Sequence, residues 1–226
     1  YTTLFRSPSR ARAGLPAAGL VFCCFNQAWK FTPEVFRLWC GLLARVPGSV
    51  LWLLQDDQAE GNLRREALAH GVSPHRLVFA PPLPQPAHLA RLALADLVLD
   101  TMPYNAHTTA SDALWAGVPV VTFAGETFAS RVAASLVHAV GLGDLVCRDI
   151  EHYAHTVVEL AYDPERLAHA RQTLVAARDT SPLFDSRRFT QDIEALYLRM
   201  MQRHVDGLPP APLPAAPAET PLPAAS

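Results

Sequence analysis

Hydrophobic and polar positions follow two alternating patterns along most of the chain. Short, almost continuous apolar runs occupy residues 20–25, 49–54, 77–80, 97–99 and 118–123. Runs of this length are typical of strands that are covered on both faces of a sheet. The longer segments between them carry apolar residues at every third or fourth position, which is the spacing of one face of an α-helix. The chain is therefore predicted to alternate between strands and helices.

Helical spacing predicts segments at 33–45, 63–70, 88–95, 108–116, 126–140, 150–162, 164–178 and 186–204. The first begins with Thr32, a good N-cap, and with a proline at its first position. Gly117 suits the left-handed turn that ends the fourth. The order β-α-β-α-β-α-β-α-β predicts an α/β fold with a Rossmann-like, doubly wound parallel sheet.

Ligands of such sheets bind beyond the carboxyl ends of the strands. In this sequence the loops at 26–30, 81–88 and 105–109 fall at that edge. We therefore expect the residues of these three loops to form one site.

The segment from Asn105 to Pro119 reads as loop, helix and turn, and its helix begins with a Thr108-Thr109 pair suited to N-capping. Free N–H groups at a helix start, together with the helix dipole, attract anions. Asp112 lies one turn further along the same face, where its carboxylate could accept hydrogen bonds from two ribose hydroxyls. The pattern fits a nucleotide diphosphate, and it also fits a capped helix with an acidic residue in its first turn.

Two other loops carry candidate side chains. Lys30 follows the first strand, where its ammonium could lie beside a pyrophosphate, although a lysine after a strand is also commonly solvated. The loop at 81–88 is rich in proline, which fixes the backbone torsion and gives a stiff rim suited to a flat base. By themselves, His88 reads as a helix-start residue and Arg91 as a surface charge.

Composition and charge narrow the class of protein. The 226 residues are 50% hydrophobic and 18% charged, which is a globular composition. The formal net charge of -2 gives no general attraction to nucleic acid or to a membrane surface, so an anion site must be local. The sequence has neither an apolar run of about 18 residues nor a signal-peptide pattern. We expect a soluble cytoplasmic protein.

Metal chemistry is not indicated. The cysteines are Cys23, Cys24, Cys40 and Cys147, without CxxC spacing, and we expect them to be reduced core residues. The Asp56-Asp57 pair lacks the Asp-x-Asp spacing of metal-dependent sugar transferases. We therefore expect no metal ligands and no metal requirement.

The two ends differ from the middle of the chain. Residues 1–20 are poorly patterned and start at Tyr1, which suggests a fragment or a tail. Residues 207–226 are dominated by proline and alanine, so we expect a disordered tail. The ligand-binding unit with its C-terminal helices is assigned to residues 21–206.

Several motifs of the middle region occur in the order found in one enzyme family. These are His107-Thr108-Thr109 with Asp112, then 114–119, which reads Leu-Trp-Ala-Gly-Val-Pro, and 125–133, which reads Gly-Glu-Thr-Phe-Ala-Ser-Arg-Val-Ala. This set closely resembles the C-terminal half of the catalytic region of protein O-GlcNAc transferases and the related SPINDLY proteins. The resemblance runs from about Val21 to His204.

The resemblance implies roles for individual residues. Lys30 would contact the donor's phosphates and stabilise the leaving group, with Gln27 nearby and His107 as a second catalytic position. The implied donor-binding residues are Gln27, Leu83, His88, Arg91, His107, Thr108, Thr109 and Asp112, of which His88 packs against uracil and Arg91 supports the base site. Gln85 stands where the animal enzymes have lysine, and Ala106 stands where glycine is usual.

The implied protein is the donor-binding half of a two-domain, B-type glycosyltransferase. It would transfer N-acetylglucosamine from UDP-GlcNAc to Ser or Thr of an acceptor protein or peptide, with inversion and without a cofactor. A SPINDLY-type fucosyl donor or another hexose is an alternative, as is a non-catalytic nucleotide-binding or scaffold module. The stretch before Val21 is too short for the second catalytic subdomain, so we expect that subdomain, and helical TPR repeats, upstream in the full-length parent.

Overall fold

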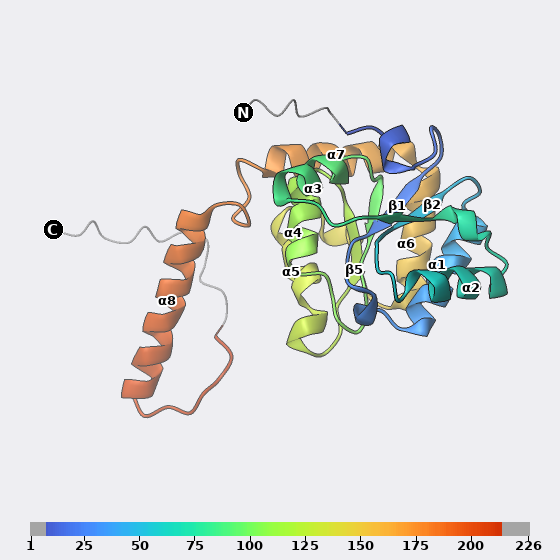
Figure 1. The fold of residues 1–226 in the computed structure, drawn as a ribbon. Helices are drawn as coiled ribbons and strands as arrows, with labels where there is room; N and C mark the ends of the chain where they lie inside the picture. Colours follow the sequence, from blue (N-terminus) through green and yellow to red (C-terminus); the bar gives the residue numbers. More distant parts are fainter. Residues whose placement is uncertain (1–7, 214–226) are drawn as a thin grey trace. The chain divides into compact units, whose positions relative to one another are not determined.

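The computed structural model describes residues 8–213 of the chain, and six parallel strands form its sheet (Figure 1). These strands are β1 (Val21–Cys24), β2 (Val50–Leu54), β3 (Leu77–Ala80), β4 (Leu97–Leu99), β5 (Val120–Phe123) and β6 (Val146–Cys147). Their spatial order is β3-β2-β1-β4-β5-β6. This is the strand order of the Rossmann fold, and the predicted fold class is confirmed.

The strand order reverses between β1 and β4. Phe22 pairs with Leu97 and Cys23 with Val98, so the loops that follow these two strands leave the sheet side by side. In open α/β sheets the crevice at such a reversal is the usual ligand position. The fold therefore brings the loop after β1 next to the loop after β4.

Helices cover both faces of the sheet, with α4 and α5 on one side and α1 and α6 on the other (Figure 1). The α-helices are α1 (Pro33–Arg45), α2 (Glu60–Ala69), α3 (Gln85–Leu92), α4 (Thr108–Trp115), α5 (Val132–Ala139), α6 (Ile150–Tyr162), α7 (Pro164–Ala177) and α8 (Ser186–Val205). Short 3-10 turns occur at η1 (Ala11–Ala13), η2 (Ala28–Lys30), η3 (Pro74–Arg76), η4 (Phe128–Ser130) and η5 (Gly143–Leu145). Burial from both sides explains why every residue of β1 is buried and why the strands read as continuous apolar runs.

Several predicted boundaries are wrong. Helix α3 begins at Gln85 instead of His88, because Pro86 lies in the first turn, where a missing N–H costs no hydrogen bond. The helix predicted at 126–140 is split into η4 and α5, because Thr127 and Ser130 cap the short turn reciprocally. The two-residue strand β6 was not predicted, since two residues are too few to show a pattern.

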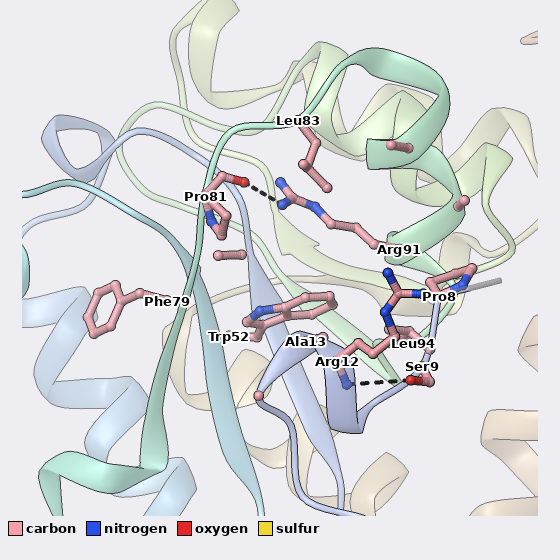
Figure 2. Close-up of a pocket in the computed structure, with 14 residues that line it drawn as sticks. Pro8, Ser9, Arg12, Ala13, Trp52, Phe79, Pro81, Leu83, Arg91 and Leu94 are labelled. Carbon is pink, nitrogen blue, oxygen red and sulfur yellow. Dashed lines mark hydrogen bonds between the residues drawn. The ribbon is translucent and has the colours of Figure 1, made fainter. Parts of the chain in front are cut away.

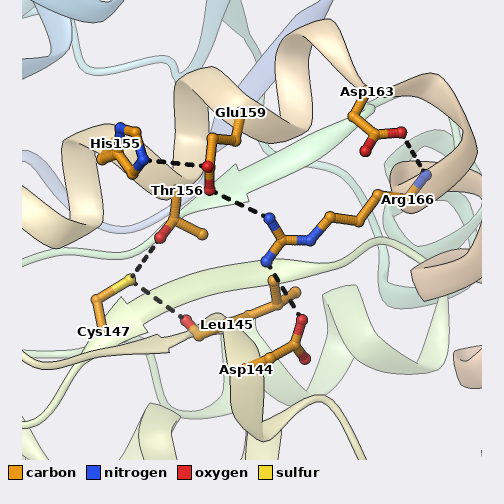
Figure 3. Close-up of polar contacts among 8 residues, drawn as sticks. All are labelled: Asp144, Leu145, Cys147, His155, Thr156, Glu159, Asp163 and Arg166. Carbon is orange, nitrogen blue, oxygen red and sulfur yellow. Dashed lines mark hydrogen bonds and ion pairs between the residues drawn. The ribbon is translucent and has the colours of Figure 1, made fainter.

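The last strand is fixed to the helix that follows it. Cys147 Sγ lies 3.5 Å from Thr156 Oγ1 of α6, and Arg166 of α7 pairs with Glu159 and Asp144 at 3.2 Å and 3.4 Å (Figure 3). The ion pairs are partly exposed and therefore contribute little, on the order of 1 kcal/mol or less each. Packing of buried side chains such as Tyr153 supplies most of the attachment of α6 to the sheet.

The four cysteines are core residues, as predicted. All are free thiols with buried side chains. Burial raises the pKa of the Cys24 thiol to about 12 and that of Cys40 to about 11. These thiols are therefore protonated at neutral pH and unsuited to nucleophilic chemistry.

The described part of the N-terminal stretch is attached to the sheet. Arg10 pairs with Asp96 at 2.7 Å, and the N–H of Val21 donates to the same carboxylate at 2.8 Å. Leu15 is buried. Residues 8–20 therefore pack against the amino ends of β1 and β4. The predicted domain boundary at residue 21 stays a prediction.

The chain divides into two compact units, residues up to Asp179 and residues from Thr180 onward. The second unit contains α8, which Asp185 caps by accepting a hydrogen bond from the Arg188 N–H. Of the predicted tail at 207–226, residues 214–226 lie outside the described part of the chain. No helix within residues 8–213 is long and apolar enough to cross a membrane.

Candidate donor site at the carboxyl ends of β1 and β4

Lys30 reaches from the loop after β1 to the loop after β4. Its N–H donates to Gln27 O at 3.0 Å and closes η2, and its Nζ donates to Asn105 O at 3.3 Å. The ammonium also lies 4.3 Å from the centre of the Tyr104 ring. Lys30 is the only lysine in the sequence.

A buried acidic residue near Lys30 partly offsets the effect of burial on the lysine. Burial lowers the pKa of Lys30, and the nearby Asp100 acts in the opposite direction. Asp100 itself is fully buried, and burial raises its pKa to about 7. Its Oδ1 accepts from the N–H groups of Thr101 and Ala106, and its Oδ2 accepts from Thr122. Asp100 therefore shapes the loop on which Lys30 is anchored.

Helix α4 begins where predicted, but the expected threonine cap is wrong. His107 is the N-cap, without a side-chain capping bond, and its carbonyl accepts from the N–H groups of Ala110 and Ser111, both at 3.1 Å. The Thr109 hydroxyl instead donates to Asn26 Oδ1 at 2.5 Å. No described residue accepts from the N–H of Thr108 or Thr109. The helix start thus keeps donors available to an anion.

A row of rings runs along this edge of the sheet. The Tyr104 ring stacks on His107 with centroids 5.0 Å apart, and His107 meets Phe128 edge-on at 6.2 Å. Trp29 meets Tyr104 edge-on at 5.5 Å. Trp29 and Phe128 are 68% and 82% exposed, so both ends of the row are open to solvent. His107 Nε2 lies 3.3 Å from Ala129 O, which orients its ring.

His88, Arg91 and Asp112 lie together. Arg91 donates to His88 Nδ1 at 3.1 Å, so the neutral imidazole carries its proton on Nε2. Nε2 lies 4.0 Å from Asp112 Oδ2. Burial, then the Arg91 charge, lowers the pKa of His88; burial raises the pKa of Asp112. A neutral histidine ring next to a carboxylate is a surface on which a flat base can rest beside ribose hydroxyls.

The prediction that Arg91 would be a surface charge without the family context is wrong. Arg91 is 5% exposed, donates to Pro81 O, and lies 4.6 Å from the Phe25 ring. It braces the loop after β3 from within, because a guanidinium can satisfy a carbonyl, a ring nitrogen and an aromatic face at once.

A cavity of about 530 Å³ adjoins this loop. Leu83 and Arg91 line it on one side, Trp52 lies on its wall, and Arg12 and Ala13 of the N-terminal segment close the other side (Figure 2). Leu83 is 43% exposed, so a base packed on it would cover apolar surface. Gln85 begins α3 with an exposed side chain.

The remaining predicted residues are more loosely defined. Gln27 and Thr108 are exposed at the rims of the two loops. Ala106 is buried and has no positive φ, so alanine in place of the usual glycine carries no backbone strain here. Its methyl group packs instead against Ala110 and Ala133.

Sequence reasoning missed three polar residues under the site: Asn26, Asp100 and Asn105. All three are buried, and their hydrogen bonds join segments more than 70 residues apart or fold the loop after β4. Asp100 closes a strand and Asn26 and Asn105 stand in loops, positions where polar residues are common in any protein. A buried position at a strand end was the available signal, and it does not tell a structural role from a binding role.

The matching family model decides the classification. Residues 4–193 match the model described as glycosyl transferase family 41. The chain belongs to glycosyltransferase family 41. Its fold, the loops after β1 and β4, and the motif at 107–112 all lie within the matched region.

Relatives of this family 41 chain occur in plants and animals. It is 42% identical over 205 residues to a probable UDP-N-acetylglucosamine–peptide N-acetylglucosaminyltransferase, SEC, of Arabidopsis thaliana, and 40% identical over 202 residues to the corresponding Caenorhabditis elegans transferase. It is 35% identical to the SPINDLY protein of Solanum lycopersicum. These matches cover 90%, 89% and 83% of the chain. The chain spans only 21%, 18% and 21% of those relatives.

Solved structures agree with this assignment. The family 41 chain matches the K341M mutant of an O-GlcNAc transferase from Thermobaculum terrenum with a TM-score of 0.78 and 35% identity, over 84% of this chain and 37% of that one. It also matches WaaG, a glycosyltransferase involved in lipopolysaccharide biosynthesis, with a TM-score of 0.63 and 19% identity, over 81% of this chain and 49% of that one. The second match concerns the fold alone.

Proposed function

We propose that this chain is the donor-binding half of a protein O-glycosyltransferase. In this proposal it holds UDP-GlcNAc while N-acetylglucosamine moves to a serine or threonine hydroxyl of an acceptor protein, with inversion at the anomeric carbon. The observation that carries the proposal is the contact of Lys30 Nζ with Asn105 O at 3.3 Å, which places the ammonium on the loop leading into α4. A cation and a helix start then face the same diphosphate. The names of the relatives supply the donor and the acceptor class.

Each predicted residue has a task in this proposal. The diphosphate lies at the start of α4, held by the N–H groups of Thr108 and Thr109 and by Lys30, with Gln27 and His107 beside it. Asp112 accepts from the ribose hydroxyls. Uracil packs between His88 and Leu83, with Arg91 behind them.

Charge stabilisation of the leaving group is the chemical contribution of this half. The acceptor oxygen attacks the anomeric carbon while the bond to the β-phosphate oxygen breaks, and negative charge gathers on UDP. Lys30 and the helix start are preorganised to stabilise that charge, so no metal ion or cofactor is required. An upstream catalytic half supplies the acceptor groove and the base that takes the hydroxyl proton. Upstream TPR repeats bind acceptor proteins, and the enzyme acts in the cytoplasm.

The donor is the point to test first. Calorimetry on the full-length parent protein compares UDP-GlcNAc, UDP-glucose, GDP-fucose and UDP. We expect UDP-GlcNAc and UDP to bind and GDP-fucose to bind at least tenfold more weakly. Preference for GDP-fucose would make the enzyme a SPINDLY-type fucosyltransferase, and no binding of any sugar nucleotide would reduce the chain to a scaffold.

A further inference from the structure

Asn26 links three segments that meet under the proposed diphosphate. It lies two residues after the end of β1 and is 5% exposed. Its Nδ2 donates to Thr101 Oγ1 at 2.8 Å, just after β4, and its Oδ1 accepts from Thr109 Oγ1 at 2.5 Å, in the first turn of α4. One carboxamide therefore connects the end of β1 with both the strand and the helix that flank the loop at 101–107.

The direction of these hydrogen bonds is fixed by their partners. A threonine hydroxyl has one proton, and that of Thr101 is donated to Tyr104 O at 2.6 Å. Thr101 Oγ1 must therefore accept from the amide NH₂ of Asn26, which turns the amide oxygen toward Thr109. The proton of Thr109 is then committed to Asn26.

This arrangement changes what Thr109 can do for a phosphate. A phosphate oxygen accepts hydrogen bonds, and in this arrangement the Thr109 hydroxyl has no proton left to donate to it. Anion recognition at this residue must come from its backbone N–H, and its side chain serves to hold the helix start in place. The same loop carries Asn105 O, the acceptor of Lys30 Nζ.

We propose that Asn26 is a positioning residue for diphosphate binding. It holds the first turn of α4 against the end of β1, so that the free N–H groups of the helix and the Lys30 ammonium point at one phosphate group. Asn26 itself need not touch the ligand. This inference rests on the proposed function, because it assumes that the anion at the helix start is the diphosphate of a uridine nucleotide.

The test compares a ligand that has the phosphates with one that lacks them. Affinities for UDP and for uridine are measured by calorimetry on the 226-residue chain and on Asn26→Leu, Thr109→Val and the double variant. We expect each single variant to bind UDP at least tenfold more weakly and to bind uridine within twofold of the parent. The double variant should be no weaker than the weaker single variant, because both changes break the same link.

Two control variants separate positioning from general damage. Thr109→Ser keeps the hydroxyl and should retain UDP affinity within about twofold. Thr108→Val changes the exposed neighbour, so any loss it causes should add to that of Asn26→Leu. If Asn26→Leu does not fold, the comparison of Thr109→Val with Thr109→Ser decides, because it breaks the same hydrogen bond at a partly exposed position.

Other outcomes would overturn the inference. Equal weakening of UDP and uridine, or additive losses in the double variant, would show that Asn26 has only a structural role, while UDP binding by the parent chain would leave the proposed function standing. If the unmutated 226-residue chain binds neither UDP nor uridine, the proposed function fails together with this inference.

Discussion

The ligand role proposed for Asp112 can be tested apart from the stability of helix α4. Its carboxylate lies 4.0 Å from His88 Nε2 and keeps part of its surface open to solvent. Nothing in this contact is needed to hold the helix, because α4 is fixed to the sheet through buried Ala110, Ala113 and Leu114. A ligand role is therefore separable from stability at this residue.

Replacement of Asp112 by alanine is expected to weaken UDP binding by about 1–3 kcal/mol, the range for hydrogen bonds to a charged group. The melting temperature should stay close to that of the parent. Calorimetry with UDP measures the loss, and Ser111→Ala, one position earlier on α4, is the matched control. Equal UDP affinity in Asp112→Ala and the parent would remove Asp112 from the site.

Lys30 can be observed directly because it is the only lysine. Reductive ¹³C-methylation gives one lysine signal, which is distinct from the α-amino group that titrates near about 8. Burial lowers the pKa of Lys30 in the free chain, and an adjacent diphosphate should raise it. We expect UDP, but not uridine, to shift the NMR titration upward. A titration that is unchanged by saturating UDP would place the phosphates elsewhere.

The catalytic role proposed for Lys30 has to be measured in the full-length protein. If the ammonium stabilises charge on the departing UDP, Lys30→Ala should lower kcat by about a hundredfold or more, which is the effect of removing one preorganised donor. Lys30→Arg keeps the charge but not the compact shape, so its kcat should lie between that of the unmutated enzyme and that of Lys30→Ala. A change confined to KM would indicate ground-state binding without a part in the chemistry.

Most elements could be predicted from the hydrophobic pattern, but local exceptions could not. The strands β3 and β4 and the helices α1 and α6 have the predicted bounds, because their apolar spacing is long or sharply delimited. The early start of α3 and the break before α5 depend on a first-turn proline and on a hydroxyl capping pair. A capping interaction changes the stability of a helix by about 1 kcal/mol. That is enough to move the end of a helix without changing the hydrophobic pattern.

The candidate site was predictable only in part, for a different physical reason. Lys30, His88 and Asp112 stand in recognisable motifs, and the structure brings them to one edge of the sheet. Asn26 and Asp100 act through partners that are distant in the sequence, such as Thr109 and Thr122. Pairing of this kind is set by the register of β4 against β1 and β5, which one sequence does not contain as a pattern.

The loop after β4 should make stability depend on pH. Burial raises the pKa of Asp100 to about 7, whereas an unfolded aspartate titrates near about 3.9. Between these values the folded chain binds a proton that the unfolded chain has lost, so this group makes stability fall as pH rises toward about 7. The stabilising contribution of Asp100 is fully present below the pKa of the unfolded state and is lost above the pKa of the folded state.

Asp100→Asn should remove this contribution. The asparagine oxygen can still accept from the N–H groups of Thr101 and Ala106, and its NH₂ can donate to Thr122 Oγ1, so the fold of the loop is preserved. We expect the stability of the variant relative to the parent to increase between pH 4.5 and pH 8, measured by urea unfolding. Subtracting the stability of the parent from that of the variant at each pH cancels the contributions of other titrating groups, such as His88. A constant difference across this range would show that Asp100 is ionised throughout.

At the scale of the whole molecule, the proposed function assigns one side of a reaction to the 226 residues. The first unit presents Lys30, the start of α4 and the surface proposed to hold uracil at one edge of a single sheet. The histidines next to this edge, His88 and His107, are both engaged, one by Arg91 and the other by the Tyr104 ring and Ala129 O. Arg91 occupies the lone pair of His88 Nδ1, so this ring has none left for the proton of an acceptor hydroxyl, and the proposal places His107 beside the diphosphate.

We therefore expect the purified 226-residue chain to bind UDP but to transfer no sugar to an acceptor peptide above background. A B-type transferase reacts its donor between two Rossmann-like halves, and the orientation of the acceptor accounts for several kcal/mol of barrier lowering, about 7–11 in well-oriented intramolecular reactions. The measurement is transfer of radiolabelled N-acetylglucosamine from UDP-GlcNAc, with the full-length parent as the positive control and a reaction without protein as the background. Adding back a separately produced upstream half should restore transfer if the two halves associate. Robust transfer by the chain alone would mean that its own residues supply both the acceptor groove and the base, and the division of labour proposed between the halves would be wrong.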